Sequence, residues 1–228
     1  MSIGRVFVIE SPNPLDLLEG RSERLTLEQV CRLLGYETAS FTVRDGAELT
    51  QTLRYISSIK GSPSDKSPLY IHVSSHGSDS GVQMGPDHVP WSSLARSVQE
   101  MYRGLRYYHG PVILILSACG ASKQKLTDRL RYNLTIATEP YVPPQYVFVS
   151  SEDELAWQDA VVAWTLFYSS VIDTDYRSKR MIQDTLRRLH SSGFADVEYF
   201  RWDASTQSYR HFRPRGQTSG KPKDGHPT

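Results

Sequence analysis

The sequence predicts an α/β fold with a mostly parallel central sheet and helices packed on both of its faces. Two stretches, residues 69–77 and 112–120, each begin with an apolar run of the length of a buried strand. Strands that are apolar on both sides are typical of parallel sheets covered by helices on both faces. From Trp91 to about Arg106 the pattern is helical, so a right-handed crossover would make the two strands parallel.

The segment before these two stretches also alternates between strand and helix. Apolar patterns predict, in order, a strand at residues 5–10, a helix at 24–34, a strand at 36–43 and a helix at 49–59. Pro12 and Pro14 follow the first strand, and two prolines so close together argue against both strand and helix there.

The second half of the chain continues the alternation after a small hairpin or arm at residues 78–90. We expect a helix marked by leucines 126, 130 and 134, a strand at 146–150, helices at 160–172 and 177–190, and strands at 197–202 and 209–212. Residues 1–213 are therefore expected to form one domain. Residues 214–228 are rich in Gly, Pro, Lys and Ser, and we expect a disordered tail there.

The bulk composition excludes several classes of protein. The net charge is +1, so no overall field draws the chain to nucleic acid or to a membrane surface. No stretch reaches the roughly 20 apolar residues that span a bilayer, and the N-terminus has no signal-peptide pattern. The two cysteines, Cys31 and Cys119, cannot build a disulfide framework. We expect a cytoplasmic protein that binds neither nucleic acid nor membranes.

Each of the two apolar stretches ends in a reactive side chain followed directly by glycine: His76-Gly77 and Cys119-Gly120. Ligands of open α/β sheets bind at the carboxyl ends of the strands, where His76 and Cys119 would lie side by side. A neighbouring histidine can lower the pKa of a thiol and then shuttle its proton, so the two residues would form a nucleophilic pair. The backbone N–H groups of Gly77 and Cys119 would supply the oxyanion hole of an acyl-transfer reaction.

Other interpretations of these residues are open. Cys119 could be a buried cysteine at a strand end, and His76 a hydrogen-bonded turn histidine. Zinc is a rival reading, but His72 and His76 would lie about 13 Å apart along a strand, too far to share an ion that needs Zn–N of about 2.1 Å. Ser117 lacks the Gly-x-Ser-x-Gly elbow of serine hydrolases. We expect a cysteine nucleophile and no metal.

The two motifs together resemble the caspase-type cysteine peptidases, most of all their bacterial CHAT-type and caspase-like relatives. The caspase signature is Gln-Ala-Cys-[Arg/Gln/Gly]-Gly with a histidine about 50 residues upstream. Here Ser-Ala-Cys-Gly-Ala occupies residues 117–121, and His76 lies 43 residues before Cys119 (119 − 76 = 43). Residues 20–22 and 163–168 are similar to further segments of these families, so the resemblance covers roughly residues 3–200.

The resemblance implies a caspase–haemoglobinase fold, a three-layer α/β sandwich, with His76 and Cys119 as the catalytic dyad. In caspases the glutamine that Ser117 replaces helps to line the pocket for an aspartate side chain, so strict aspartate specificity is not implied here. Arg21 lies at a place similar to that of a caspase arginine that binds an acidic side chain.

Acidic residues indicate the opposite preference. Glu152 and Asp153 follow the strand at 146–150, on the sheet edge where this fold builds its first specificity pocket, and Asp79 lies close to His76. An acidic wall there would favour a basic side chain before the scissile bond, although Glu152 and Asp153 could instead cap the next helix. Of the two preferences, we expect the basic one.

These observations predict a cysteine endopeptidase that serves bacterial signalling or defence and needs no cofactor. Its substrate would be a protein or peptide, and a regulatory protein partner or processing would activate it. Two alternatives are kept. One is a catalytically weak interaction module that has retained the fold. The other is an acyl-transfer enzyme acting on small thioesters or amides, which would need a closed pocket.

Overall fold

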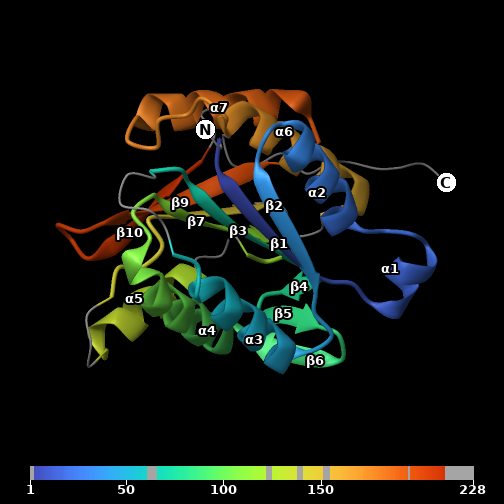
Figure 1. The fold of residues 1–228 in the computed structure, drawn as a ribbon, viewed down its shortest axis with the longest axis horizontal. Coiled ribbons are helices and arrows are strands. Elements are labelled where there is room, and N and C mark those ends of the chain that lie inside the picture. The colour runs from blue at the N-terminus through green and yellow to red at the C-terminus, as the bar shows by residue number, and fades with distance from the viewer. Residues whose placement is uncertain are drawn as a thin grey trace, which may run out of the picture.

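A seven-stranded sheet forms the centre of the protein. The computed structural model describes residues 3–60, 66–121, 125–137, 141–150, 155–194 and 196–213. The strands are β1 (Arg5–Ser11), β2 (Glu37–Thr42), β3 (Leu69–Ser75), β7 (Val112–Ser117), β8 (Tyr146–Ser150), β9 (Val197–Asp203) and β10 (Ser208–Phe212). Their order is β10-β9-β8-β7-β3-β1-β2 (Figure 1). The β8–β9 and β9–β10 pairs are antiparallel, and the other pairs are parallel. The predicted α/β fold with a mostly parallel sheet is confirmed.

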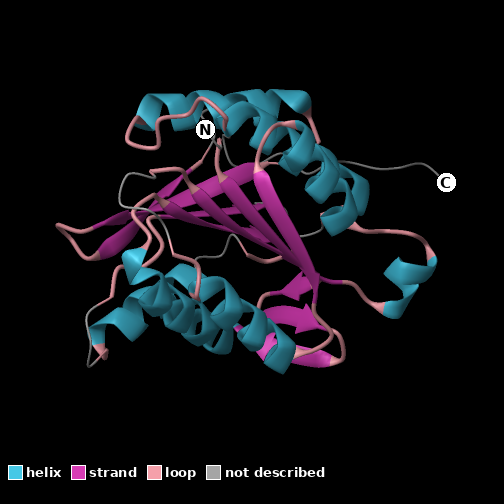
Figure 2. Cartoon of the chain, viewed as in Figure 1, coloured by secondary structure: helices cyan, strands magenta, loops and turns pink. Residues whose placement is uncertain are grey.

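Helices cover both faces of this sheet (Figure 2). One face carries α2 (Glu23–Leu33), α6 (Trp157–Val171) and α7 (Lys179–Ser192), and the other carries α3 (Gly46–Ser57), α4 (Trp91–Gly104) and α5 (Lys125–Thr135). A 3-10 turn, η1 (Leu105–Tyr107), extends α4. Each helix layer packs its apolar residues on the sheet, so two separate cores form.

The position of β7 between the two helix layers explains why its sequence is apolar without interruption. Ile113 and Ile115 belong to the core under α2, α6 and α7, whereas Leu114 and Leu116 belong to the core under α3, α4 and α5. Successive side chains of a strand point to opposite faces, so a strand covered on both sides needs an apolar residue at every position.

A short helix, α1 (Pro14–Leu18), corrects the expectation that the two nearby prolines exclude a helix. Pro14 occupies the first turn, where the backbone N–H that proline lacks would have no helical partner anyway. Asn13 caps the helix: its side chain accepts a hydrogen bond from the backbone N–H of Asp16, and the Asp16 carboxylate accepts one from the backbone N–H of Asn13. The helix therefore starts directly after β1 and lies beyond its carboxyl end (Figure 1).

The arm expected at residues 78–90 is a small antiparallel sheet of β4 (Gly77–Ser78), β5 (Gly81–Met84) and β6 (Asp87–Pro90). Val82 and Met84 of β5 are buried and join the core beneath α3 and α4. This small sheet is thereby fixed to the main body next to the end of β3.

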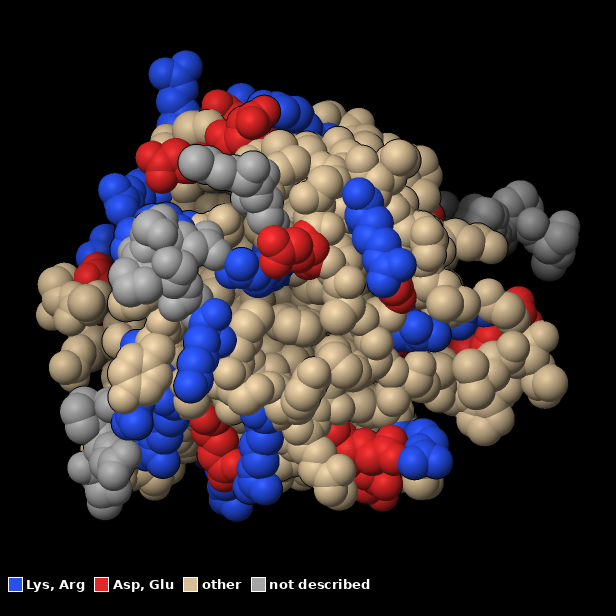
Figure 3. All heavy atoms as spheres, in the orientation of Figure 1, with Lys and Arg blue, Asp and Glu red and all other residues tan. Residues whose placement is uncertain are grey.

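Charges of both signs share the surface. Figure 3 shows Lys and Arg side chains close to Asp and Glu side chains over one face of the molecule. Ion pairs at the surface include Arg54–Glu100, at 3.0 Å. Within the described ranges, no helix has both the length and the apolar character needed to cross a bilayer. The tail expected at residues 214–228 lies outside the described residues.

Candidate active site

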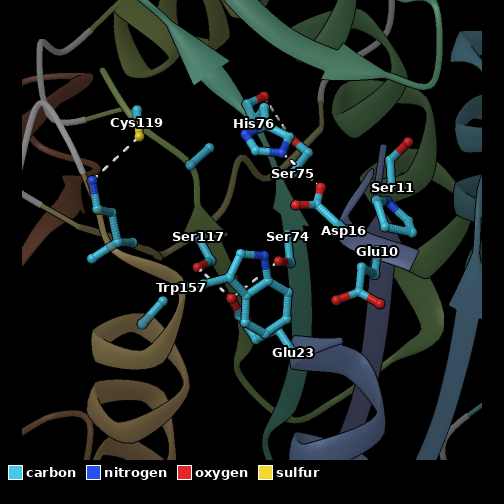
Figure 4. Close-up of a pocket in the computed structure, with 14 residues that line it drawn as sticks. Glu10, Ser11, Asp16, Glu23, Ser74, Ser75, His76, Ser117, Cys119 and Trp157 are labelled. Carbon is cyan, nitrogen blue, oxygen red and sulfur yellow. Dashed lines mark hydrogen bonds and ion pairs between the residues drawn. The ribbon is translucent and has the colours of Figure 1, made fainter. Parts of the chain in front are cut away.

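His76 and Cys119 are brought together by the pairing of β3 with β7. The strands are parallel neighbours, with Ser74 opposite Ser117, and each reactive residue follows two positions later. His76 and Cys119 both line one pocket at the carboxyl edge of the sheet (Figure 4). The strand pairing thus produces the juxtaposition that the sequence predicts.

The backbones that follow the two strands are in direct contact. A Cβ atom added to Gly77 would lie 2.3 Å from the carbonyl oxygen of Cys119 and 3.0 Å from its nitrogen. Gly120 has a φ of +71°, and a Cβ there would lie 2.8 Å from the carbonyl of Ser78. Both glycines are therefore needed to let the backbone segments with the two expected oxyanion donors, Gly77 and Cys119, approach each other.

We expect Gly77→Ala to lower the reactivity of Cys119 by about 10²-fold, because the added methyl group must displace the Cys119 backbone and a misplacement near 1 Å has that effect in active sites. The crowding should also cost about 1–3 kcal/mol of unfolding free energy. The rate of Cys119 alkylation by iodoacetamide measures the first effect, and urea denaturation measures the second.

Gly4→Ala is the matched control for this change. Its added methyl would lie 3.1 Å from Pro68, away from the pocket. It should leave the alkylation rate unchanged. A rate for Gly77→Ala equal to that of the parent protein would contradict the proposed contact.

The Cys119 thiol is accessible, in contrast to that of Cys31. Cys119 is partly exposed, and its Sγ accepts a hydrogen bond from the backbone N–H of Leu155 at 3.4 Å. Cys31 is fully buried in α2, and burial raises the pKa of its thiol to about 12. A thiol reagent at neutral pH therefore distinguishes the two cysteines.

The imidazole of His76 is held from the side of α1. The side chain of His76 is 50% exposed, whereas that of Asp16 is only 3% exposed. The Nε2 atom of His76 lies 2.8 Å from Oδ2 of Asp16 and 3.0 Å from Nδ2 of Asn13. The other ring nitrogen, Nδ1, points to the side of the pocket on which Cys119 lies (Figure 4).

Beneath His76 and Cys119, Glu23 is the centre of a buried hydrogen-bond network (Figure 4). Its carboxylate accepts hydrogen bonds from Nε2 of His72 at 2.5 Å, from the Ser117 hydroxyl at 2.9 Å and from the Ser74 hydroxyl at 3.1 Å. The indole N–H of Trp164 donates to the Ser117 oxygen at 2.8 Å. The network ties α2, β3, β7 and α6 together below the pocket.

A second buried carboxylate, Glu10, lines the same pocket at the end of β1. It accepts hydrogen bonds from the Ser22 hydroxyl at 2.8 Å and from the backbone N–H of Arg24 at 3.1 Å. Burial is the largest influence on Glu10 and raises the pKa of its carboxyl above the ordinary value. With Asp16 and Glu23, three acidic side chains line a cavity of about 60 Å³.

The predicted site residues separate into three groups. His76, Cys119 and Ser117 line the pocket, whereas Gly77, Asp79 and Arg21, although described, lie outside its lining. The Arg21 guanidinium pairs with Glu19 and lies 3.8 Å from Asp16. The backbone carbonyl of Asp79 accepts a hydrogen bond from the indole of Trp91. Glu152 and Asp153 lie outside the described residues.

Sequence reasoning missed Asp16, Glu10 and Glu23. A signal existed for Asp16, because Asn13 and Asp16 have the spacing of a capping box, which would have placed a helix and a fixed carboxylate after β1. Glu10 and Glu23 had no such signal, since an acidic residue at a strand end or in a first helical turn is most simply read as exposed.

Comparison with known proteins adds no assignment: no model of a known family matches the chain, and no match was found among the curated proteins. Among the residues that the structure describes, no group of three or more His, Cys, Asp and Glu side chains is arranged to hold a metal ion.

Proposed function

We propose that the protein is a cysteine endopeptidase of the caspase-like superfamily, with a caspase–haemoglobinase type of sandwich and a His76–Cys119 dyad. The observation that carries the proposal is that the two residues end neighbouring parallel strands and line one pocket. The partial exposure of both side chains adds support, because a nucleophile and its base must reach a substrate.

In the proposed reaction, the Cys119 sulfur attacks the carbonyl carbon of a peptide bond while His76 holds the thiol proton. The oxyanion forms beside the backbone N–H groups of Gly77 and Cys119. His76 then gives its proton to the departing amine as the C–N bond breaks, which leaves an acyl-enzyme. Water attacks this thioester, and the carboxylic acid and the free thiol are released.

A peptide fits the pocket better than a small acyl donor. Pockets that enclose small molecules measure roughly 300–1,000 Å³, whereas the cavity beside Cys119 measures about 60 Å³. Both dyad side chains reach the solvent, since that of His76 is 50% exposed and Cys119 is partly exposed. An extended chain could lie across such an exposed dyad, which favours the endopeptidase over an enzyme for small thioesters.

In this proposal, the preferred substrate is a peptide with a basic residue before the scissile bond. The acidic side chains of Glu10 and Glu23 line the pocket beside Asp16, which contacts His76, and none of the described lining residues is Lys or Arg. Arg21, the residue that favoured an acidic substrate, is engaged with Glu19 and Asp16. The charge balance of the pocket supports a cationic side chain.

The test is hydrolysis of fluorogenic peptides that differ only in the residue before the scissile bond: Arg, Lys, Asp or Leu. We expect kcat/KM for Arg and Lys to exceed that for Leu by at least about tenfold, because a charge-assisted hydrogen bond contributes about 1.5–3 kcal/mol. Cys119→Ala, prepared identically, controls for contaminating peptidases.

Equal hydrolysis of the Arg and Leu peptides would overturn the preference for a basic residue but would leave the proposed peptidase activity standing. If no peptide is cleaved and a peptidyl chloromethyl ketone does not label Cys119, the interaction module becomes the better description.

A further inference from the structure

The structure supplies the dyad with a third group, on a helix that the sequence did not predict. We propose that Asp16 is a positioning residue that keeps the proton of neutral His76 on Nε2, so that Nδ1 is free to act as the base for Cys119. The inference rests on the proposed function for its catalytic meaning, but the tautomer can be observed without any substrate.

Asp16 and His76 differ strongly in burial. Asp16 presents a carboxylate that is 3% exposed to a histidine that is 50% exposed, across 2.8 Å. A buried carboxylate hydrogen-bonded to one ring nitrogen restricts the rotation of the imidazole and favours one tautomer, as the aspartate does in nucleophilic triads.

Helix α1 holds the Asp16 carboxylate in place. Oδ2 of Asp16 accepts a hydrogen bond from the backbone N–H of Asn13 at 3.0 Å, while the Asn13 side chain accepts one from the Asp16 backbone N–H at 2.8 Å. Arg21 lies 3.8 Å from the other oxygen, Oδ1. These contacts fix the rotamer of Asp16 before any substrate is bound, which is what a positioning group requires.

Asn13 and Asp16 compete for a hydrogen bond to one nitrogen atom, Nε2 of His76. Nε2 of a neutral imidazole either donates or accepts a hydrogen bond. If it carries the proton, it donates to Asp16. If it does not, it can accept from Nδ2 of Asn13 at 3.0 Å, but its lone pair then faces the carboxylate oxygen at 2.8 Å. Repulsion between the lone pair and the carboxylate disfavours this second state.

The favoured tautomer suits the proposed chemistry. With the proton on Nε2, the bare Nδ1 points to the Cys119 side of the pocket (Figure 4). When Nδ1 takes the thiol proton, the resulting imidazolium keeps its hydrogen bond to Asp16, and the opposite charges attract. No rearrangement of the ring is needed between the two states.

The test compares Asp16→Asn with the parent protein and with Glu19→Gln, which removes a carboxylate that pairs with the same Arg21 but does not contact His76. Long-range ¹⁵N–¹H spectra report which nitrogen of His76 carries the proton, and His76→Ala identifies its signals among those of the seven histidines. Peptide hydrolysis and the rate of Cys119 alkylation by iodoacetamide are measured on the same samples.

We expect the proton on Nε2 in the parent protein and in Glu19→Gln, and on Nδ1 in Asp16→Asn, whose amide can donate to Nε2. In Asp16→Asn, kcat should fall by about 10²- to 10⁴-fold with KM unchanged, and alkylation should slow. Asp16→Glu, which retains the charge, should restore the Nε2 proton. These results would support the inference even if no peptide is cleaved, in which case the proposed function alone fails.

Three results would overturn the inference and leave the proposed peptidase activity standing. The first is an unchanged tautomer in Asp16→Asn with hydrolysis within about twofold of the parent. The second is a proton on Nδ1 in the parent protein itself, which can be observed even if Asp16→Asn does not fold. The third is an equal loss of activity in Glu19→Gln, because the effect would then not be specific to Asp16.

Discussion

Replacement of Cys119 by alanine is expected to abolish peptide hydrolysis, with a loss of about 10⁴-fold or more, and to leave the fold intact. Sγ is the proposed nucleophile, so no other group of the pocket replaces it. The side chain is partly exposed, and its hydrogen bond from the N–H of Leu155 is long at 3.4 Å, so its removal disturbs little packing. Hydrolysis rates and urea denaturation of the same preparation measure the two effects.

Two further variants control this result. His76→Ala should lose nearly as much activity as Cys119→Ala, and the double variant little more, because a dyad acts as one unit. Cys31→Ser should retain activity and lose at most a little stability, since Cys31 lies in the core under α2 and outside the pocket. Equal hydrolysis by Cys119→Ala and the parent protein would refute the proposed function.

Glu23→Gln is expected to lower the free energy of unfolding by about 2–4 kcal/mol. The substitution keeps the shape of the side chain but leaves one acceptor oxygen where the donors of His72, Ser74 and Ser117 need two. Each buried donor without a partner costs about 1–3 kcal/mol. Urea denaturation should show a lower midpoint with an unchanged slope, because the surface exposed on unfolding stays the same.

Glu37→Gln on the edge strand β2 is the matched control. It breaks a surface ion pair with Arg5, in which the Glu37 side chain is 57% exposed, and such pairs contribute about 0–1 kcal/mol. If Glu23→Gln destabilises the protein no more than Glu37→Gln does, the network beneath the dyad does not stabilise the fold.

Much of the fold could be predicted because its strongest signals are local. The uninterrupted apolar run of β7 follows from burial on both faces, and the helix at Trp91 follows from apolar residues at helical spacing. Helix α1 could not be predicted in the same way. It has five residues and no buried apolar side chain, so its sequence has no amphipathic pattern that indicates a helix. Pro14 therefore argued against a helix, although proline is well suited to a first helical turn.

The site was predictable only where it depends on strand ends. His76 and Cys119 meet because parallel strands share an edge, which is a rule of topology. Asp16, Glu10 and Glu23 reach the same pocket through the packing of β1, α1 and α2, and no local pattern specifies those distances. The same reason explains why the contacts of Arg21 could not be predicted. Its partners, Glu19 and Asp16, are brought to it by the turn between α1 and α2.

The hydrogen bonds around the dyad also determine when the pocket can exist during folding. They join residues far apart in the chain: His76 to Asp16 over 60 positions, and Ser117 to Glu23 over 94. Such non-local contacts must overcome a large loop-closure entropy before they form, which places parallel sheets among the slower folding topologies. A nascent chain that has not yet added β7 to β3 therefore has no assembled dyad. Under the proposed function, proteolytic competence would arise only with the native state, because a slowly folding or misfolded copy would carry the Cys119 thiol without His76 beside it.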